Sequence, residues 1–134
     1  MATIVIAVVD DLFFACKIRG AAEQVGVRVT FVKTLEDAVR SVTENRPSLI
    51  IADMNSQRCD AIELAVRLKA DREFDSIPLV GFFAHVQTEL QQAAQAAGYD
   101  RVLPRSAFVK QLGELLSSDY TDLAEKKAKN SHST

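Results

Sequence analysis

The stretch LIIADMNS, Leu49–Ser56, decides how the chain folds. Its apolar residues run directly into one carboxylate, Asp53, and a polar loop begins after it. An apolar run without polar alternation is typical of a strand that is buried on both faces of a parallel sheet. Because burying an isolated charge is costly, we expect the carboxylate to lie at the end of the strand, at the mouth of the core.

The composition is that of one globular domain. The 134 residues are 48% apolar and 25% charged, with a net charge of −2, which argues against a broad basic face for nucleic acid. No apolar run is long enough to span a bilayer. The two cysteines, Cys16 and Cys59, lack metal-ligand spacing, which predicts free thiols in a reducing compartment. We therefore expect a cytoplasmic protein that binds neither nucleic acid nor membrane.

Apolar runs alternate with helical patterns along the chain. The expected strands are Ile4–Val9, Val27–Val32, Leu49–Ala52, Leu79–Phe83 and Tyr99–Leu103, and the expected helices begin near Leu12, Thr34, Asp60, His85 and Ser106. Such alternation predicts an α/β fold, a doubly wound (βα)5 sandwich whose parallel five-stranded sheet has the common order 2-1-3-4-5. We expect residues 1–119 to form the domain and residues 120–134 to be a polar tail that frays or extends the last helix.

The third helix carries a recognisable start signal. Asp60 with Glu63 pairs a capping side chain with an acid three residues later. The apolar residues Ile62, Ala65 and Val66 then form its expected inward stripe.

Three carboxylates follow neighbouring strands of this predicted sheet. Asp10 and Asp11 come after the first strand, and Asp53 ends the third, so all three are expected in the crevice where strand order reverses. Two unit charges about 4 Å apart repel by roughly 4 kcal/mol at an effective dielectric of 20. A Mg²⁺ ion, which prefers carboxylate oxygens and water, removes that repulsion. The alternative is that Asp11 only caps the first helix and Asp53 is a solvated loop acid.

Four segments of the chain resemble the receiver domain of two-component response regulators. They are VVDD at residues 8–11, IIADMN at 50–55, IPLVGFFA at 77–84 and VLPRSAF at 102–108. The resemblance covers roughly residues 3–117 and is to the stand-alone, single-domain kind. It implies a flavodoxin-like fold with the strand order predicted above.

The resemblance also implies a role for each matching residue. Asp53 would accept a phosphoryl group from a sensor histidine kinase, a phosphotransfer protein or a small phosphodonor. Asp10, Asp11, Asp53 and the backbone carbonyl of Asn55 would hold Mg²⁺, and Ala84 would keep the phosphoryl site open. Such a protein is a signalling switch rather than an enzyme with a free substrate, and it passes its state to a downstream target protein.

Four positions depart from the family pattern. Phe83 stands where receivers have Ser or Thr, Arg105 where they have lysine, Ser106 where they have proline, and Val102 where they have an aromatic residue. Arginine keeps the positive charge and can contact phosphate with two N–H groups. Two hypotheses follow: a receiver phosphorylated at Asp53 that uses Arg105, or a pseudo-receiver that binds a partner without phosphorylation. The intact acids favour the first, and the missing hydroxyl and lysine favour the second.

Overall fold

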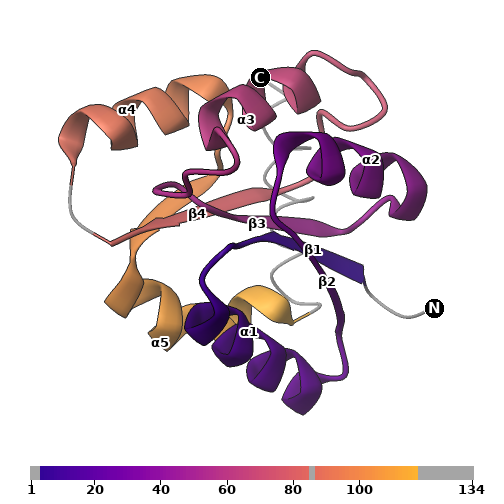
Figure 1. Ribbon diagram of the computed structural model, residues 1–134, viewed down its shortest axis with the longest axis vertical. Helices are drawn as coiled ribbons and strands as arrows, with labels where there is room; N and C mark the ends of the chain where they lie inside the picture. The colour runs from indigo at the N-terminus through magenta and orange to yellow at the C-terminus, as the bar shows by residue number, and fades with distance from the viewer. Residues whose placement is uncertain (1–3, 85–86, 118–134) are drawn as a thin grey trace, which may run out of the picture.

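A five-stranded parallel sheet flanked by helices organises residues 4–84 and 87–117, which the computed structural model describes (Figure 1). The strands are β1 Ile4–Val8, β2 Arg28–Val32, β3 Leu49–Asp53, β4 Leu79–Phe83 and β5 Arg101–Pro104. The helices are α1 Leu12–Val25, α2 Leu35–Asn45, α3 Ala61–Lys69, α4 Thr88–Ala97 and α5 Arg105–Leu116. The sheet order β2-β1-β3-β4-β5 confirms the predicted fold class. The expected tail, and the expected helix start at His85, lie outside the described residues.

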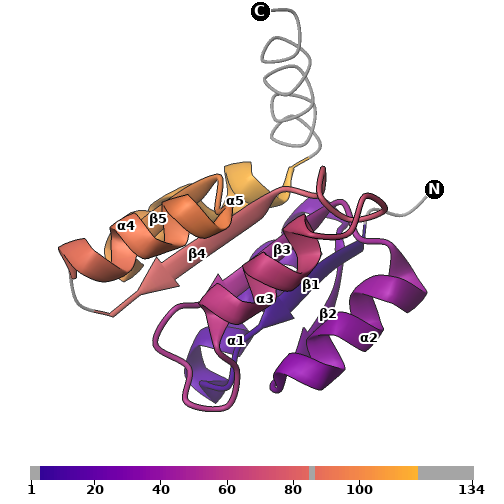
Figure 2. The same ribbon diagram turned by 90° about the horizontal axis from the view of Figure 1, so that it is seen from above.

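The helices form two layers. Helices α1 and α5 cover one face of the sheet, and α2, α3 and α4 cover the other (Figures 1 and 2). Since α1 follows β1 and α3 follows β3, the connections of these neighbouring strands leave toward opposite faces. In open α/β sheets, ligand sites lie at such a point, outside the carboxyl ends of the strands. No helix within the described ranges is long and apolar enough to cross a membrane.

The caps and the buried faces set the helix boundaries. Helix α1 begins after its cap Asp11 and ends at Gly26, whose φ of 72° suits glycine. The inward stripe predicted for α3 is wrong at Val66, which is 49% exposed. Leu64 and Leu68 are buried beside Ala65 instead. Two leucines remove more apolar surface from water than one valine, so the helix turns to face them inward.

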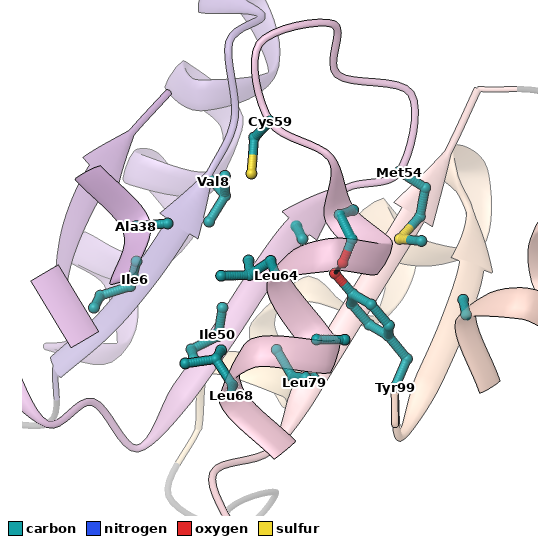
Figure 3. Packing of buried hydrophobic residues seen from close by; sticks show 14 of the residues in the cluster. Ile6, Val8, Ala38, Ile50, Met54, Cys59, Leu64, Leu68, Leu79 and Tyr99 are labelled. Carbon is teal, nitrogen blue, oxygen red and sulfur yellow. Dashed lines mark hydrogen bonds between the residues drawn. The ribbon is translucent and has the colours of Figure 1, made fainter. Parts of the chain in front are cut away.

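Two apolar clusters fill the space between the sheet and the helices. The cluster under α1 and α5 contains a stack of three rings, in which Phe82 lies 4.5 Å from Phe14 and 4.7 Å from Phe108 between centroids. The cluster under α2, α3 and α4 contains Tyr99, which points toward α3 in Figure 3. Its hydroxyl donates to the Ala61 carbonyl at 2.8 Å, and burial raises the pKa of this phenol. This bond ties the start of α3 to the chain before β5.

Replacing Tyr99 by Phe removes this buried hydrogen bond without removing the ring. We expect the free energy of unfolding to fall by about 1–2 kcal/mol, because the bond is lost in an apolar setting. The midpoint of urea unfolding measures this loss, provided that the slope of the unfolding free energy against urea concentration does not change. Tyr99→Leu, which also removes ring contacts, should cost more, and an unchanged midpoint for Tyr99→Phe would show that the bond contributes nothing.

Candidate functional site

Asp53 is the only buried carboxylate among the described residues, with 7% of its surface exposed. It ends β3, and its Oδ1 accepts the backbone N–H of Asn55 at 2.9 Å. Burial raises the pKa of Asp53 above its usual range, against the lowering effects of the Asn55 N–H and the Arg105 charge. The nearby charges of Asp11 and Asp10 raise this pKa further. Asp53 is therefore a partly desolvated carboxylate that is influenced by one positive and two negative side chains.

Asp11 uses both of its carboxylate oxygens. Its Oδ1 accepts the backbone N–H groups of Phe13 at 2.9 Å and Phe14 at 3.2 Å, which caps α1. Its Oδ2 lies 3.3 Å from Nη2 of Arg105. The helix-capping role weighed for Asp11 from the sequence is therefore real, and an ion pair is added to it.

Asp10 forms the second acid–arginine pair of this edge. Its Oδ2 lies 3.5 Å from Nε of Arg58, which comes from the loop between β3 and α3. Both side chains are largely exposed, so the pair contributes little to stability. Sequence reasoning missed Arg58. The available signal was its place in the loop after β3, which meets the loop after β1 at the same edge of the sheet.

The acids of this edge suit a hard divalent cation by their chemistry, since carboxylate and backbone carbonyl oxygens are the ligands that Mg²⁺ takes in proteins. Within residues 4–84 and 87–117, however, no three histidine, cysteine, aspartate or glutamate side chains lie together in an arrangement that could hold a metal ion. Arginines engage Asp10 and Asp11 instead. The donors fit the ion in type, and a metal would compete with two guanidinium groups for them.

Arg105 lies over the aromatic stack. Its guanidinium carbon is 4.7 Å from the centroid of the Phe14 ring, a cation–π contact. Its Nε is buried and has no hydrogen-bond partner among the described residues. The side chain is thus held beside Asp11 by a ring on one side and a carboxylate on the other, close enough to lower the pKa of Asp53.

Two of the positions that depart from the receiver pattern, Phe83 and Val102, lie in the core. Phe83 is 1% exposed and Val102 is 6% exposed, and both belong to the cluster under α2, α3 and α4. Ala84, the residue after β4, is exposed instead. Its backbone N–H donates to the side-chain Oδ1 of Asn55 at 2.8 Å. This hydrogen bond connects the loop after β3 with the loop after β4, and nothing in the sequence pattern indicated it.

Known proteins resemble this chain in structure rather than in sequence. No protein-family model matches it, and no curated protein sequence matches it. A CheY-like response regulator receiver domain protein from Methanospirillum hungatei JF-1 superposes with a TM-score of 0.81 at 16% identity, over 95% of this chain and 99% of that one.

Two further solved structures have a similar fold. The phosphorylated cyanobacterial phytochrome response regulator RcpA gives a TM-score of 0.75 at 20% identity, over 87% of this chain and 89% of that one. The Mn²⁺-bound form of response regulator Rcp1 gives a TM-score of 0.74 at 14% identity, over 84% of this chain and 91% of that one. The chain has the fold of response regulator receiver domains. In this receiver fold, Asp10, Asp11, Asp53 and Arg105 gather at the carboxyl edge of the sheet.

Replacing Asp53 by Asn should stabilise the protein at neutral pH. Because the pKa of Asp53 is raised in the fold, its ionisation costs stability as the pH rises from the ordinary value of 3.8, and the cost is complete above the folded pKa. We expect Asp53→Asn to raise the free energy of unfolding at pH 7 by about 1 kcal/mol, the order of a single stabilising substitution. The gain should shrink as the pH falls toward and below the ordinary value of 3.8, where the wild-type carboxyl is protonated in both states.

Thermal unfolding of the two proteins at pH 7 and at pH 3.5 provides the measurement. Asp37→Asn, at an exposed acid of α2 that pairs with Arg40, is the matched control and should change the melting temperature little. A lower melting temperature for Asp53→Asn at pH 7 would contradict the argument.

Proposed function

We propose that the protein is a phospho-acceptor receiver of a two-component phosphorelay, with Asp53 as the acceptor. The observation that carries this proposal is the placement of the one buried carboxylate of the described residues at the carboxyl end of the central strand. Burial makes the ionised form of this carboxylate costly, and a neutral asparagine could accept the same Asn55 N–H at a lower cost. Phosphoryl acceptance would account for an acid at this position.

The reaction uses the free oxygen of the Asp53 carboxylate. The Asn55 N–H holds one oxygen in place, and the other attacks the phosphorus of a phosphohistidine or of a small acyl phosphate. A P–O bond to Asp53 forms as the bond from phosphorus to the donor nitrogen or oxygen breaks, and the leaving group takes the electron pair. The positive charge of Arg105, which also acts on Asp53, would offset the charge of the incoming phosphoryl group.

The proposed cofactor is Mg²⁺, held by Asp10, Asp11, Asp53 and the backbone carbonyl of Asn55. When bound, such an ion neutralises charge on the transferring phosphoryl group. The donor types support this assignment, and Rcp1, which has the same fold, has a Mn²⁺-bound form. The side chains of Arg58 and Arg105 compensate the acids of this edge in the ion's absence.

The proposed partners follow from the chemistry. A sensor histidine kinase or a phosphotransfer protein supplies the phosphoryl group in the cytoplasm, and a downstream target protein responds to it. The small residue Ala84 leaves the site open from the β4 side. The contribution of the chain itself is an acceptor that is positioned by the core and bordered by one permanent positive charge.

One observation favours a second candidate, a pseudo-receiver that binds its partner without phosphorylation. Phe83 and Val102 are buried apolar side chains, so neither can form a hydrogen bond to a phosphoryl oxygen. The acid–arginine pairs also give Asp10 and Asp11 a role without a metal. This candidate leaves the buried Asp53 without a purpose, and for that reason we rank it second.

Incubation with Mg²⁺ and acetyl phosphate, followed by intact-mass measurement, tests the acceptor directly. The wild-type protein should gain the mass of one phosphoryl group, and Asp53→Asn should gain none, because the nucleophile is removed. Asp37→Asn is again the matched control and should gain the group like wild type. If acetyl phosphate and phosphoramidate both leave the wild-type mass unchanged, the pseudo-receiver is the better description.

Replacing Arg58 by Gln should strengthen the binding of a divalent cation. The change releases Asp10 from its ion pair, and exposed pairs of this kind are worth about 0.2–1 kcal/mol, so the Kd for Mn²⁺ should fall by a factor of about 1.4 to 5. Titration calorimetry or the paramagnetic signal of free Mn²⁺ measures it without any phosphodonor. Arg67→Gln, which breaks an exposed pair with Glu63 on α3, should leave the Kd unchanged. Weaker Mn²⁺ binding by Arg58→Gln would show that the guanidinium does not compete with the ion.

A further inference from the structure

Asn55 joins the two loops that border Asp53. Its backbone N–H donates to Asp53 Oδ1 at 2.9 Å, and its side-chain Oδ1 accepts the Ala84 N–H at 2.8 Å. Ala84 follows β4 directly, and the chain continues from it toward α4. A single residue therefore contacts both the acceptor carboxylate and the segment that leads to the next helix.

This connection matters because the last side chain of β4 among the described residues, Phe83, offers no polar group toward Asp53. Phe83 is buried to 1% exposure and carries no polar side-chain atom. Among the described residues, the Asn55–Ala84 bond is the only side-chain hydrogen bond between the loop after β3 and the residue after β4. The state of Asp53 can reach Ala84 through this asparagine.

We propose that Asn55 is a latch, which occupies the Ala84 N–H while Asp53 is unmodified and releases it when a phosphoryl group arrives. The proposal rests on Asp53 being the phospho-acceptor. A phosphoryl group brings negative charge and three acceptor oxygens, and an N–H bonds a charged oxygen more strongly than the neutral oxygen of an amide. Asp53 and the Ala84 N–H lie on either side of one asparagine, so a group added to Asp53 competes with the Asn55 side chain for that N–H.

The latch makes opposite predictions for two substitutions of the same residue. Asn55→Ala removes the competing acceptor, keeps the backbone groups and leaves the Ala84 N–H open. Asn55→Asp keeps an acceptor oxygen of the same reach and adds a negative charge, so it should hold Ala84 at least as firmly and repel a phosphoryl group. A merely structural role for Asn55 would weaken the protein in both variants alike. Asn45→Ala is the matched control, because it removes hydrogen bonds to Ser41 within α2.

Amide hydrogen exchange at Ala84, followed by NMR, tests the latch in the unmodified protein. Exchange should be about fivefold faster in Asn55→Ala than in wild type, the effect expected for one exposed hydrogen bond. Asn55→Asp and Asn45→Ala should exchange at the wild-type rate or more slowly. Equal exchange in wild type and Asn55→Ala would overturn the proposal.

Titration with beryllofluoride and Mg²⁺, an analogue of the phosphoryl group, tests the release. Asn55→Ala should bind it about fivefold more tightly than wild type, because no latch must open, and Asn55→Asp should bind it more weakly. In wild type, binding should shift the Ala84 amide resonance. Equal affinities for wild type and Asn55→Ala would refute the latch while leaving the acceptor function intact. Binding by neither protein would refute the acceptor function, and the latch would fall with it.

Discussion

The free-energy cost of one buried carboxylate governs the carboxyl edge of this sheet. Asp53 continues an apolar strand that is buried on both faces, and the desolvation of its charge raises its pKa. Two favourable contributions oppose that cost, the backbone N–H of Asn55 and the charge of Arg105. Asn55 lies in the loop after β3 and Arg105 begins α5, so segments that follow two different strands meet around the acid at the end of β3.

Asp11 has two roles at the same edge, as a helix cap and as the partner of an arginine. As the cap of α1 it satisfies two backbone N–H groups that the helix leaves free, and its second oxygen faces Arg105. A lysine at position 105 would supply the charge, but it could not stack a flat guanidinium over the Phe14 ring. The guanidinium of Arg105 therefore fits the aromatic stack below it, and these contacts fix the place of its charge beside Asp11.

The sequence predicted the architecture well and the contacts of the site less well. Strand order and the edge that carries Asp53 followed from apolar runs and from topology, which depend on patterns repeated over many residues. The inward face of α3 was wrong at Val66, because the two possible stripes overlap at Ala65 and only packing decides between them. The loop position of Arg58 indicated its edge of the sheet, but the partner in its ion pair and the side-chain bond of Asn55 could not be predicted. Each depends on the conformation of a short polar loop, for which a single sequence carries no periodic signal.

The carboxyl edge of the sheet is tightly packed toward the core and exposed toward solvent. A Cβ added at Gly81 of β4 would lie 2.6 Å from Sδ of Met54, so the residue after Asp53 packs directly against the neighbouring strand. Phe82, which pairs with Asp53 in the sheet, anchors the same place from the other face through its ring stack. The position of the Asp53 backbone is thus set by packing on both faces and needs no metal. Under the proposed function, a bound ion or phosphoryl group would displace the exposed side chains of Arg58 and Asn55, because moving them leaves the core unchanged.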